Sequence, residues 1–133
     1  MAFIVYSTDD HRVPVQEYLP AVTQLQAKVG MSLKLDAASG VLVGAAGATK
    51  PEYICMCDRS SVAAGELISV IRVQPDMIFE TTFSVAASAV KLGSKVTIAT
   101  GGMEVTGTTE GGVAEVVAMD GTEAGATCRV RFV

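Results

Sequence analysis

Cys55, Cys57, Cys128 and His11 are the side chains of this 133-residue chain best suited to metal binding or nucleophilic chemistry. Cys55 and Cys57 are two positions apart, so both thiols would lie on the same face of a strand. The cysteines of structural zinc sites are usually separated by two or more residues, and this spacing does not match. The three thiols and His11 could together supply four metal ligands. We prefer buried, unreactive thiols, because free cysteine is among the most commonly buried residue types.

Nucleophilic catalysis assisted by histidine would have to use His11, which is the only histidine of the chain. It lies in a polar stretch, and no nucleophile motif accompanies it. Residues 44–51 contain glycines and Lys50, but the interval between Gly47 and Lys50 differs from that of a phosphate-binding Walker loop. The two catalytic carboxylates of a glycosidase come together only in the folded protein, so their spacing in the sequence gives little evidence for or against such a site. We therefore expect a protein that is not an enzyme and that needs no cofactor and no metal.

The composition indicates contacts with other protein chains. Hydrophobic residues make up 50% of the chain, charged residues only 18%, and the mean hydropathy is +0.43. Charged residues normally make up about 25% of a globular chain, so a domain this small has little charge with which to cover its surface. We interpret the shortage as surface that another chain covers. A core rich in glycine and alanine is the simpler alternative.

Charge and hydropathy also argue against several classes of partner. The net charge is −4 and the pI is about 4.9. The chain has no basic run of the kind that binds nucleic acid. Its apolar runs fall short of the ~20 residues that a membrane-spanning helix needs. It shows no secretory signal, and its odd cysteine count argues against a disulfide framework, so we expect synthesis in the cytoplasm.

The strongest strand signal covers residues 67–83, which are rich in β-branched and aromatic side chains. Pro75 and Asp76 interrupt this stretch with residues that favour a turn. We therefore predict two strands joined at that turn. Both faces of these strands carry apolar residues, so we expect them to lie between a core and a second buried contact. In the second strand the residues that share one face are Met77, Phe79, Thr81 and Phe83.

Other segments alternate or break in ways that predict further strands. Residues 31–36 alternate, with Met31, Leu33 and Leu35 predicted to point inward and Ser32, Lys34 and Asp36 outward. Residues 41–43 would return as the partner strand after a glycine turn. The last third of the chain contains four further predicted strands, at residues 95–99, 103–106, 113–119 and 127–133. Two earlier segments with less distinctive patterns are also predicted to be strands, residues 21–29 and 52–57. In the final strand Cys128, Val130 and Phe132 would share one face.

These patterns predict an all-β protein with at most one short helix, which alanines favour at residues 85–90. Several short strands with regular turns are typical of a compact small β-barrel or a sandwich. We expect residues 21–133 to form a single β-rich domain and residues 1–20 an extended N-terminal arm. The apolar run in this arm could add an edge strand to its own sheet or to a neighbour's, and it consists of Phe3, Ile4, Val5 and Tyr6.

Three arginines are candidates for ion pairs between chains, namely Arg72, Arg129 and Arg131. Arg72 shares a face of its predicted strand with Ile68 and Val70, and Arg129 and Arg131 point away from the apolar face of the last predicted strand. Ordinary surface charge is the simpler alternative, because exposed ion pairs contribute little.

Three stretches of the chain together resemble the head decoration (cement) proteins of tailed bacteriophages. They are residues 30–43, residues 50–54, and residues 92–93 through to the closing Val130-Arg131-Phe132. The resemblance covers most of residues 30–133 and lies in the order of strand, glycine turn and strand. It implies a β-tulip-like fold, a trimer at the local three-fold positions of the shell, and an arm that engages the capsid protein.

The resemblance therefore implies a structural virion protein that binds the capsid exterior and stabilises adjacent capsomers. Its partners would be the major capsid protein and further copies of itself, and residues 2–18 would be the arm. Candidate contact residues are Phe3, Ile4, Val5, Tyr6, Arg72, Arg129 and Arg131. The alternative is a small β-barrel accessory module that binds a peptide, a glycan or a small ligand.

Overall fold

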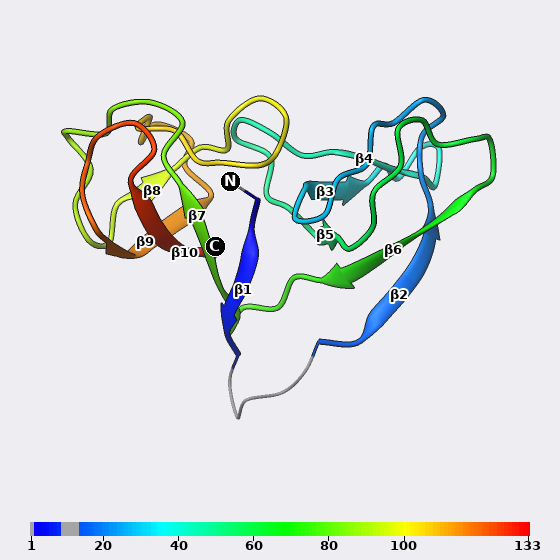
Figure 1. Ribbon diagram of the computed structural model, residues 1–133, viewed down its shortest axis with the longest axis horizontal. Helices are drawn as coiled ribbons and strands as arrows, with labels where there is room; N and C mark the ends of the chain where they lie inside the picture. The colour runs from blue at the N-terminus through cyan, green and yellow to red at the C-terminus, as the bar shows by residue number, and fades with distance from the viewer. Residues whose placement is uncertain (1, 9–13) are drawn as a thin grey trace.

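The computed structural model describes residues 2–8 and 14–133, and this part of the chain contains ten strands and no helix. The strands form two antiparallel five-stranded sheets, which occupy the left and right of Figure 1. The all-β prediction is confirmed. The sheets do not close on themselves, so the expected barrel is wrong in this respect.

Sheet A has the strand order β1-β7-β10-β9-β8. It joins the start of the chain to its second half, and its strands in that order are Ile4–Ser7, Ile78–Thr82, Thr127–Phe132, Ala114–Met119 and Lys95–Val96. The predicted alternation of the last strand is confirmed. Cys128, Val130 and Phe132 are buried, whereas Arg129 and Arg131 lie on the opposite face.

Sheet B has the strand order β2-β6-β5-β3-β4. All of its strands come from one continuous segment, and in that order they are Gln16–Pro20, Leu67–Arg72, Tyr53–Cys55, Ser32–Leu35 and Leu42–Gly44. The predicted pairing of β3 with β4 is confirmed. Ser32 does not point outward as predicted. It is buried, and its Oγ donates a hydrogen bond to the carbonyl oxygen of Ala45 at 2.6 Å.

The buried side chains form two cores, which we call core 1 and core 2. Core 1 packs the inner face of sheet A against the Ile54 and Ile71 side chains of sheet B. It contains all four phenylalanines of the chain, Phe3, Phe79, Phe83 and Phe132. Core 2 lies on the other face of sheet B, under two long connections, and includes Ala21, Ala27, Leu33, Leu42, Tyr53, Cys55, Val62, Ile68 and Val70.

The two strands predicted within residues 67–83 do form, but they do not pair with each other. β6 belongs to sheet B and β7 to sheet A, so the turn at Pro75 and Asp76 connects the sheets. The predicted apolar face of the second strand is confirmed, because Met77, Phe79 and Phe83 are buried in core 1 and Thr81 is buried as well. The sequence pattern gave the faces correctly but could not give the strand partners.

Three other predicted elements are wrong. Residues 103–106 form no strand, and among them only Val105 makes isolated bridges, to Phe83 and to Ile98. Residues 21–29 form turns, and only Ala21 and Ala27 make isolated bridges. Gln24 has a φ of 67°, a left-handed conformation that interrupts a strand. Residues 85–90 contain no helix; instead a single turn closes where the Val90 amide donates to the carbonyl oxygen of Ala87 at 2.9 Å. Helix propensity is a weak preference that the surrounding packing overrides here.

The described residues of the predicted arm are strands of the chain's own sheets. β1 pairs with β7 and β2 pairs with β6, each at a sheet edge. The start of the chain is also held by Gly30, whose carbonyl oxygen accepts a hydrogen bond from the Phe3 amide at 3.0 Å. Gly30 has a φ of +84°, and an added Cβ would meet the Ala2 side chain. Glycine is therefore required where the loop before β3 meets the first residues.

Candidate functional site

The apolar run at residues 3–6 is divided between two faces of sheet A. Phe3 is only 2% exposed and packs edge-on against Phe132, with the ring centroids 5.2 Å apart. Val5 is half-buried and packs against core 1. Ile4 and Tyr6 point the other way and are 52% and 53% exposed. In this conformation only Ile4 and Tyr6 present most of their side-chain surface to a partner.

Tyr6 is part of a stack on the outer face of sheet A. The guanidinium carbon of Arg129 lies 4.0 Å from the centre of the Tyr6 ring, which is a close cation–π contact. The Nε of Arg129 also donates to Glu80 Oε2 at 3.2 Å. Ile4 is the register partner of Glu80 on the neighbouring strand. We call Ile4, Tyr6, Glu80 and Arg129 the β1 face.

All three candidate arginines have acidic partners within the chain. Arg131 pairs with Glu115 at 2.7 Å on the same outer face of sheet A, as Arg129 does with Glu80. In sheet B the structure brings Arg72 within 3.3 Å of Glu17, where two guanidinium nitrogens donate to the two carboxylate oxygens. Hydrogen bonding to Glu17 raises the pKa of Arg72. These pairs match the simpler interpretation of the arginines as surface charge, although a partner could still contact their exposed edges.

Sheet B carries an exposed apolar surface that the sequence analysis missed. Tyr18 is 63% exposed and Leu67 is 55% exposed. Tyr18 is the register partner of Ser69, and Leu67 is the register partner of Pro20, so the four residues share one face of β2 and β6. We call Tyr18, Pro20, Leu67 and Ser69 the β2–β6 face.

The β2–β6 face continues a surface that is buried elsewhere. Ile71 lies two positions beyond Ser69 on the same face of β6, and it is covered by core 1. In Figure 1, β2 and β6 extend from the middle of the molecule away from sheet A. Ser69 lies between the exposed Leu67 and the buried Ile71 on this face of β6. Its Oγ is buried and has no hydrogen-bond partner among the described residues.

One sequence signal could have revealed this surface. Proline is tolerated at the edge of a sheet, where its missing amide donor is not needed, so Pro20 is compatible with an edge strand at residues 16–20. In this strand Tyr18 and Pro20 share one face, and Tyr18 is exposed there.

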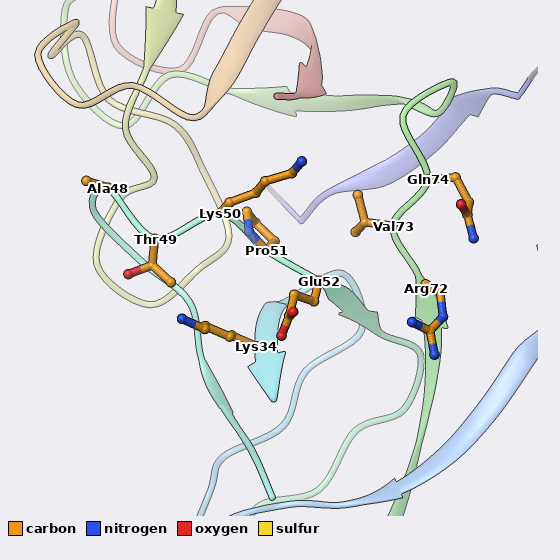
Figure 2. Close-up of a pocket in the computed structure, with 9 residues that line it drawn as sticks. All are labelled: Lys34, Ala48, Thr49, Lys50, Pro51, Glu52, Arg72, Val73 and Gln74. Carbon is orange, nitrogen blue, oxygen red and sulfur yellow. The ribbon is translucent and has the colours of Figure 1, made fainter. Parts of the chain in front are cut away.

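An open groove of about 690 Å³ lies beside the loop that we considered for phosphate binding, and Figure 2 shows the residues that line it. The ammonium groups of Lys34 and Lys50 point in opposite directions in this view. Arg72, on the far wall, is already paired with Glu17. Because the three cations do not converge, the groove lacks the arrangement that would hold a phosphate group.

No homologue directs the assignment of this surface. Protein-family models, curated proteins and solved structures were compared with this chain, and none of them matches it. Any function must therefore be inferred from the geometry and from the resemblance in strand order.

The cysteines do not gather into a metal site. Cys55 is buried in core 2 and Cys128 in core 1, where burial raises their pKa to about 11 and about 12, respectively. Cys57 is only half-buried, so it does not fit the predicted buried thiols. Residues 2–8 and 14–133 contain no group of three or more potential ligands from His, Cys, Asp and Glu. His11 lies outside the described residues.

The remaining surface gives little guidance about chemistry. The described part of the chain has no helix of the length and hydrophobicity needed to span a membrane. Two other open grooves lie near Val15 and near Val29, and none of the three grooves is lined by an aromatic side chain. The exposed apolar and aromatic residues of the β1 face and the β2–β6 face are therefore the features most suited to binding another macromolecule.

Proposed function

We propose that this chain is a structural virion protein that binds the outside of an icosahedral phage capsid. In this role it stabilises adjacent capsomers, acts as a trimer, and has the major capsid protein and its own copies as partners. The order of strands and glycine turns supports this proposal through its resemblance to phage head decoration proteins. The low proportion of charged residues, 18%, supports it as well, because a partner would cover part of the surface.

The exposed apolar surface of the β2–β6 face is the observation that carries the proposal. Tyr18 and Leu67 are large side chains at diagonal positions on the same face of two paired strands, and each is more than half exposed. Fully burying one such side chain in an interface is worth roughly 1.5–3 kcal/mol.

The β1 face supplies a second contact surface with a different character. Its Tyr6–Arg129–Glu80 stack combines an aromatic ring with charges that are already paired. Aromatic residues and arginine are enriched at protein interfaces. Two separate surfaces on one molecule allow it to contact a copy and the shell together. Because several weak contacts then form on one trimer, their combined affinity for the shell is much higher than that of each contact alone.

The direct test adds purified protein to capsid particles that lack decoration. We expect the protein to sediment with the particles and to raise the temperature at which they break open. A protein that stays in the supernatant and leaves the disruption temperature unchanged would refute the proposal. That result together with a monomer in solution would favour the accessory-module alternative.

Variants assign the contact to its surface. We expect the double substitution Tyr18→Ser and Leu67→Ser to weaken particle binding by about tenfold or more, because each tenfold loss corresponds to about 1.4 kcal/mol. Leu92→Ser is the matched control, since Leu92 is 67% exposed but lies in a turn of the other half of the molecule. Equal binding by the double variant and the control would show that the β2–β6 face is not the contact.

Light scattering separates binding to copies from binding to the shell. If the β2–β6 face joins copies, the double variant will be smaller than the unmodified protein in solution. If it meets the capsid, the oligomer will be unchanged and only the sedimentation with particles will fall. Tyr6→Ser provides the same comparison for the β1 face.

A further inference from the structure

Two of the three thiols of this protein lie next to each other at the end of β5. The strand ends at Cys55, and the chain bends at Cys57 so that both side chains face core 2. Their sulfur atoms are 4.0 Å apart. The Cys55 thiol also donates a hydrogen bond to the carbonyl oxygen of Cys57 at 3.2 Å. This contact holds the Cys55 sulfur on the side where Cys57 lies.

We propose that Cys55 and Cys57 form a redox pair, which closes to an intramolecular disulfide when a small disulfide oxidant reaches it. The sulfurs must approach by about 2 Å to reach bonding distance. Cys57 can supply much of this movement, because it is half-buried and lies in a bend rather than in a strand. This inference rests on the geometry of the two thiols and not on the proposed function.

The two thiols have different roles because they differ in accessibility. Cys57 lies at the start of a surface connection and is the thiol that an oxidant meets first. Cys55 is fully buried, and burial raises its pKa to about 11, so little of it is thiolate at neutral pH and it is the slower thiol to attack the oxidant. Cys128 is in core 1 and takes no part.

Oxidation by glutathione disulfide proceeds in two exchange steps. The Cys57 thiolate attacks one sulfur of the oxidant, the oxidant's S–S bond breaks, and a glutathione thiolate leaves. Cys55 then loses its proton, and its thiolate attacks the Cys57 sulfur of the mixed disulfide and releases the second glutathione. The two protein thiols are oxidised, the oxidant is reduced to two glutathione thiols, and the two protein protons end on them.

Closing the disulfide would move a surface loop. Asp58 follows Cys57 directly, and its Oδ1 accepts a hydrogen bond from the Val29 amide at 3.0 Å. The next amide, that of Arg59, donates to the carbonyl oxygen of Ala27 at 2.8 Å. Drawing Cys57 inward therefore disturbs the contact between residues 58–59 and residues 27–29. A disulfide over so short a span is strained, so it should also be readily reduced.

The test measures the intact mass after incubation of the folded protein with glutathione disulfide. We expect a mass lower by two hydrogens and, after unfolding, one thiol that can still be alkylated, which peptide mapping should place at Cys128. A product with three alkylatable thiols would overturn the proposal. So would a stable glutathione adduct without the internal disulfide.

Single variants check the order of the two steps. Cys55→Ser should leave one glutathione adduct on Cys57, whereas Cys57→Ser should leave the protein unmodified because Cys55 is buried. Cys128→Ser should still lose two hydrogens. If Cys128→Ser abolishes that loss, the pair is wrongly assigned. If Cys55→Ser does not fold, Cys57→Ser and the unmodified protein still decide the proposal.

Hydrogen exchange at the Val29 amide supplies a structural readout. In the reduced protein this amide is hydrogen-bonded to Asp58. We expect at least a several-fold faster exchange in the oxidised form and a return to the original rate on reduction. Unchanged exchange in a protein that carries the disulfide would refute the coupling to the surface loop.

Discussion

The two sheets are built from the sequence in different ways. Sheet B comes from residues 16–72 alone, whereas sheet A joins β1 near the start of the chain to strands that lie between residues 78 and 132. Their cores differ as well. Core 1 holds the four phenylalanines, and core 2 is formed mainly by aliphatic side chains such as Leu33 and Leu42. Sheet A therefore depends on contacts between distant parts of the sequence, and such contacts carry a larger cost in chain entropy.

The exposed surfaces of the two sheets differ as well. The outer face of sheet A is covered by the Arg129–Glu80 and Arg131–Glu115 pairs, whereas the β2–β6 face of sheet B leaves large apolar side chains bare. The strand β1 therefore completes sheet A within the same chain, while sheet B keeps an exposed apolar surface suited to a partner.

The largest loss of stability is expected when the buried side chain of Phe3, next to β1, is removed. Phe3→Ala should lower the free energy of unfolding by about 3–5 kcal/mol, because it removes a buried ring from core 1. Urea unfolding measures this loss. Ile4→Ala is the control, since it truncates the exposed neighbour on the same strand and should cost much less. Equal effects of the two substitutions would show that β1 does not complete core 1.

The next largest loss of stability is expected at Gly30, where the loop before β3 meets the first residues of the chain. Gly30→Ala should lower the free energy of unfolding by about 1–2 kcal/mol for the left-handed backbone and by a further amount for the clash with Ala2. Gly40→Ala isolates the first contribution, because Gly40 has a φ of +72° and open space around it. Both variants would be compared by urea unfolding. If Gly30→Ala is no worse than Gly40→Ala, the start of the chain does not lie against this loop.

A smaller effect is expected from the stack on the outer face of sheet A. Arg129→Ala should cost about 1 kcal/mol, because it removes both the Tyr6 contact and the half-buried pair with Glu80. Arg72→Ala is the counterpart in sheet B, where the arginine side chain is more exposed and its cation–π contact, with Tyr53, is longer at 5.1 Å. Thermal unfolding at low and high salt measures the difference. A larger loss from Arg72→Ala would reverse the comparison.

Local patterns predicted which residues are buried better than they predicted strand partners. The faces of β7 and β10 follow directly from alternation, because side chains point to opposite sides of a strand at every second residue. Alternation contains no information on the partner of a strand, so the separation of β6 and β7 into two sheets could not be derived. Ser32 shows the same limit. Its burial is compensated by the hydrogen bond to Ala45, a residue that pattern analysis places in a loop.

The candidate site was predicted only in part. The run at residues 3–6 was predicted to add an edge strand either to its own sheet or to a neighbour's, and the structure has the first. Its inward residues could not be separated from Ile4 and Tyr6 until the pairing with β7 was known. The β2–β6 face was missed because its exposure depends on where sheet A stops covering sheet B. The proximity of Cys55 and Cys57 followed from their spacing, whereas the bend that exposes Cys57 did not.

The smallest effect is expected at the turn between β3 and β4 in sheet B. The Ser39 hydroxyl donates to the Asp36 carboxylate at 2.6 Å, and this bond, together with the Ala38 amide, lowers the pKa of Asp36 below its ordinary value of 3.8. A lowered pKa in the folded state stabilises the protein above pH 3.8, and this contribution is lost as the pH falls through the folded-state pKa. Asp36→Asn should therefore be less stable than the unmodified protein at neutral pH, and the difference should shrink in acid.

Urea unfolding at pH values above and below the ordinary pKa of Asp36 measures this difference. Ser39→Ala is the matched variant, because it keeps the carboxylate but removes the bond with the largest effect on its pKa. It should lose part of the same pH dependence. If the difference between Asp36→Asn and the unmodified protein stays constant across this range, the turn of sheet B does not depend on the charge of Asp36.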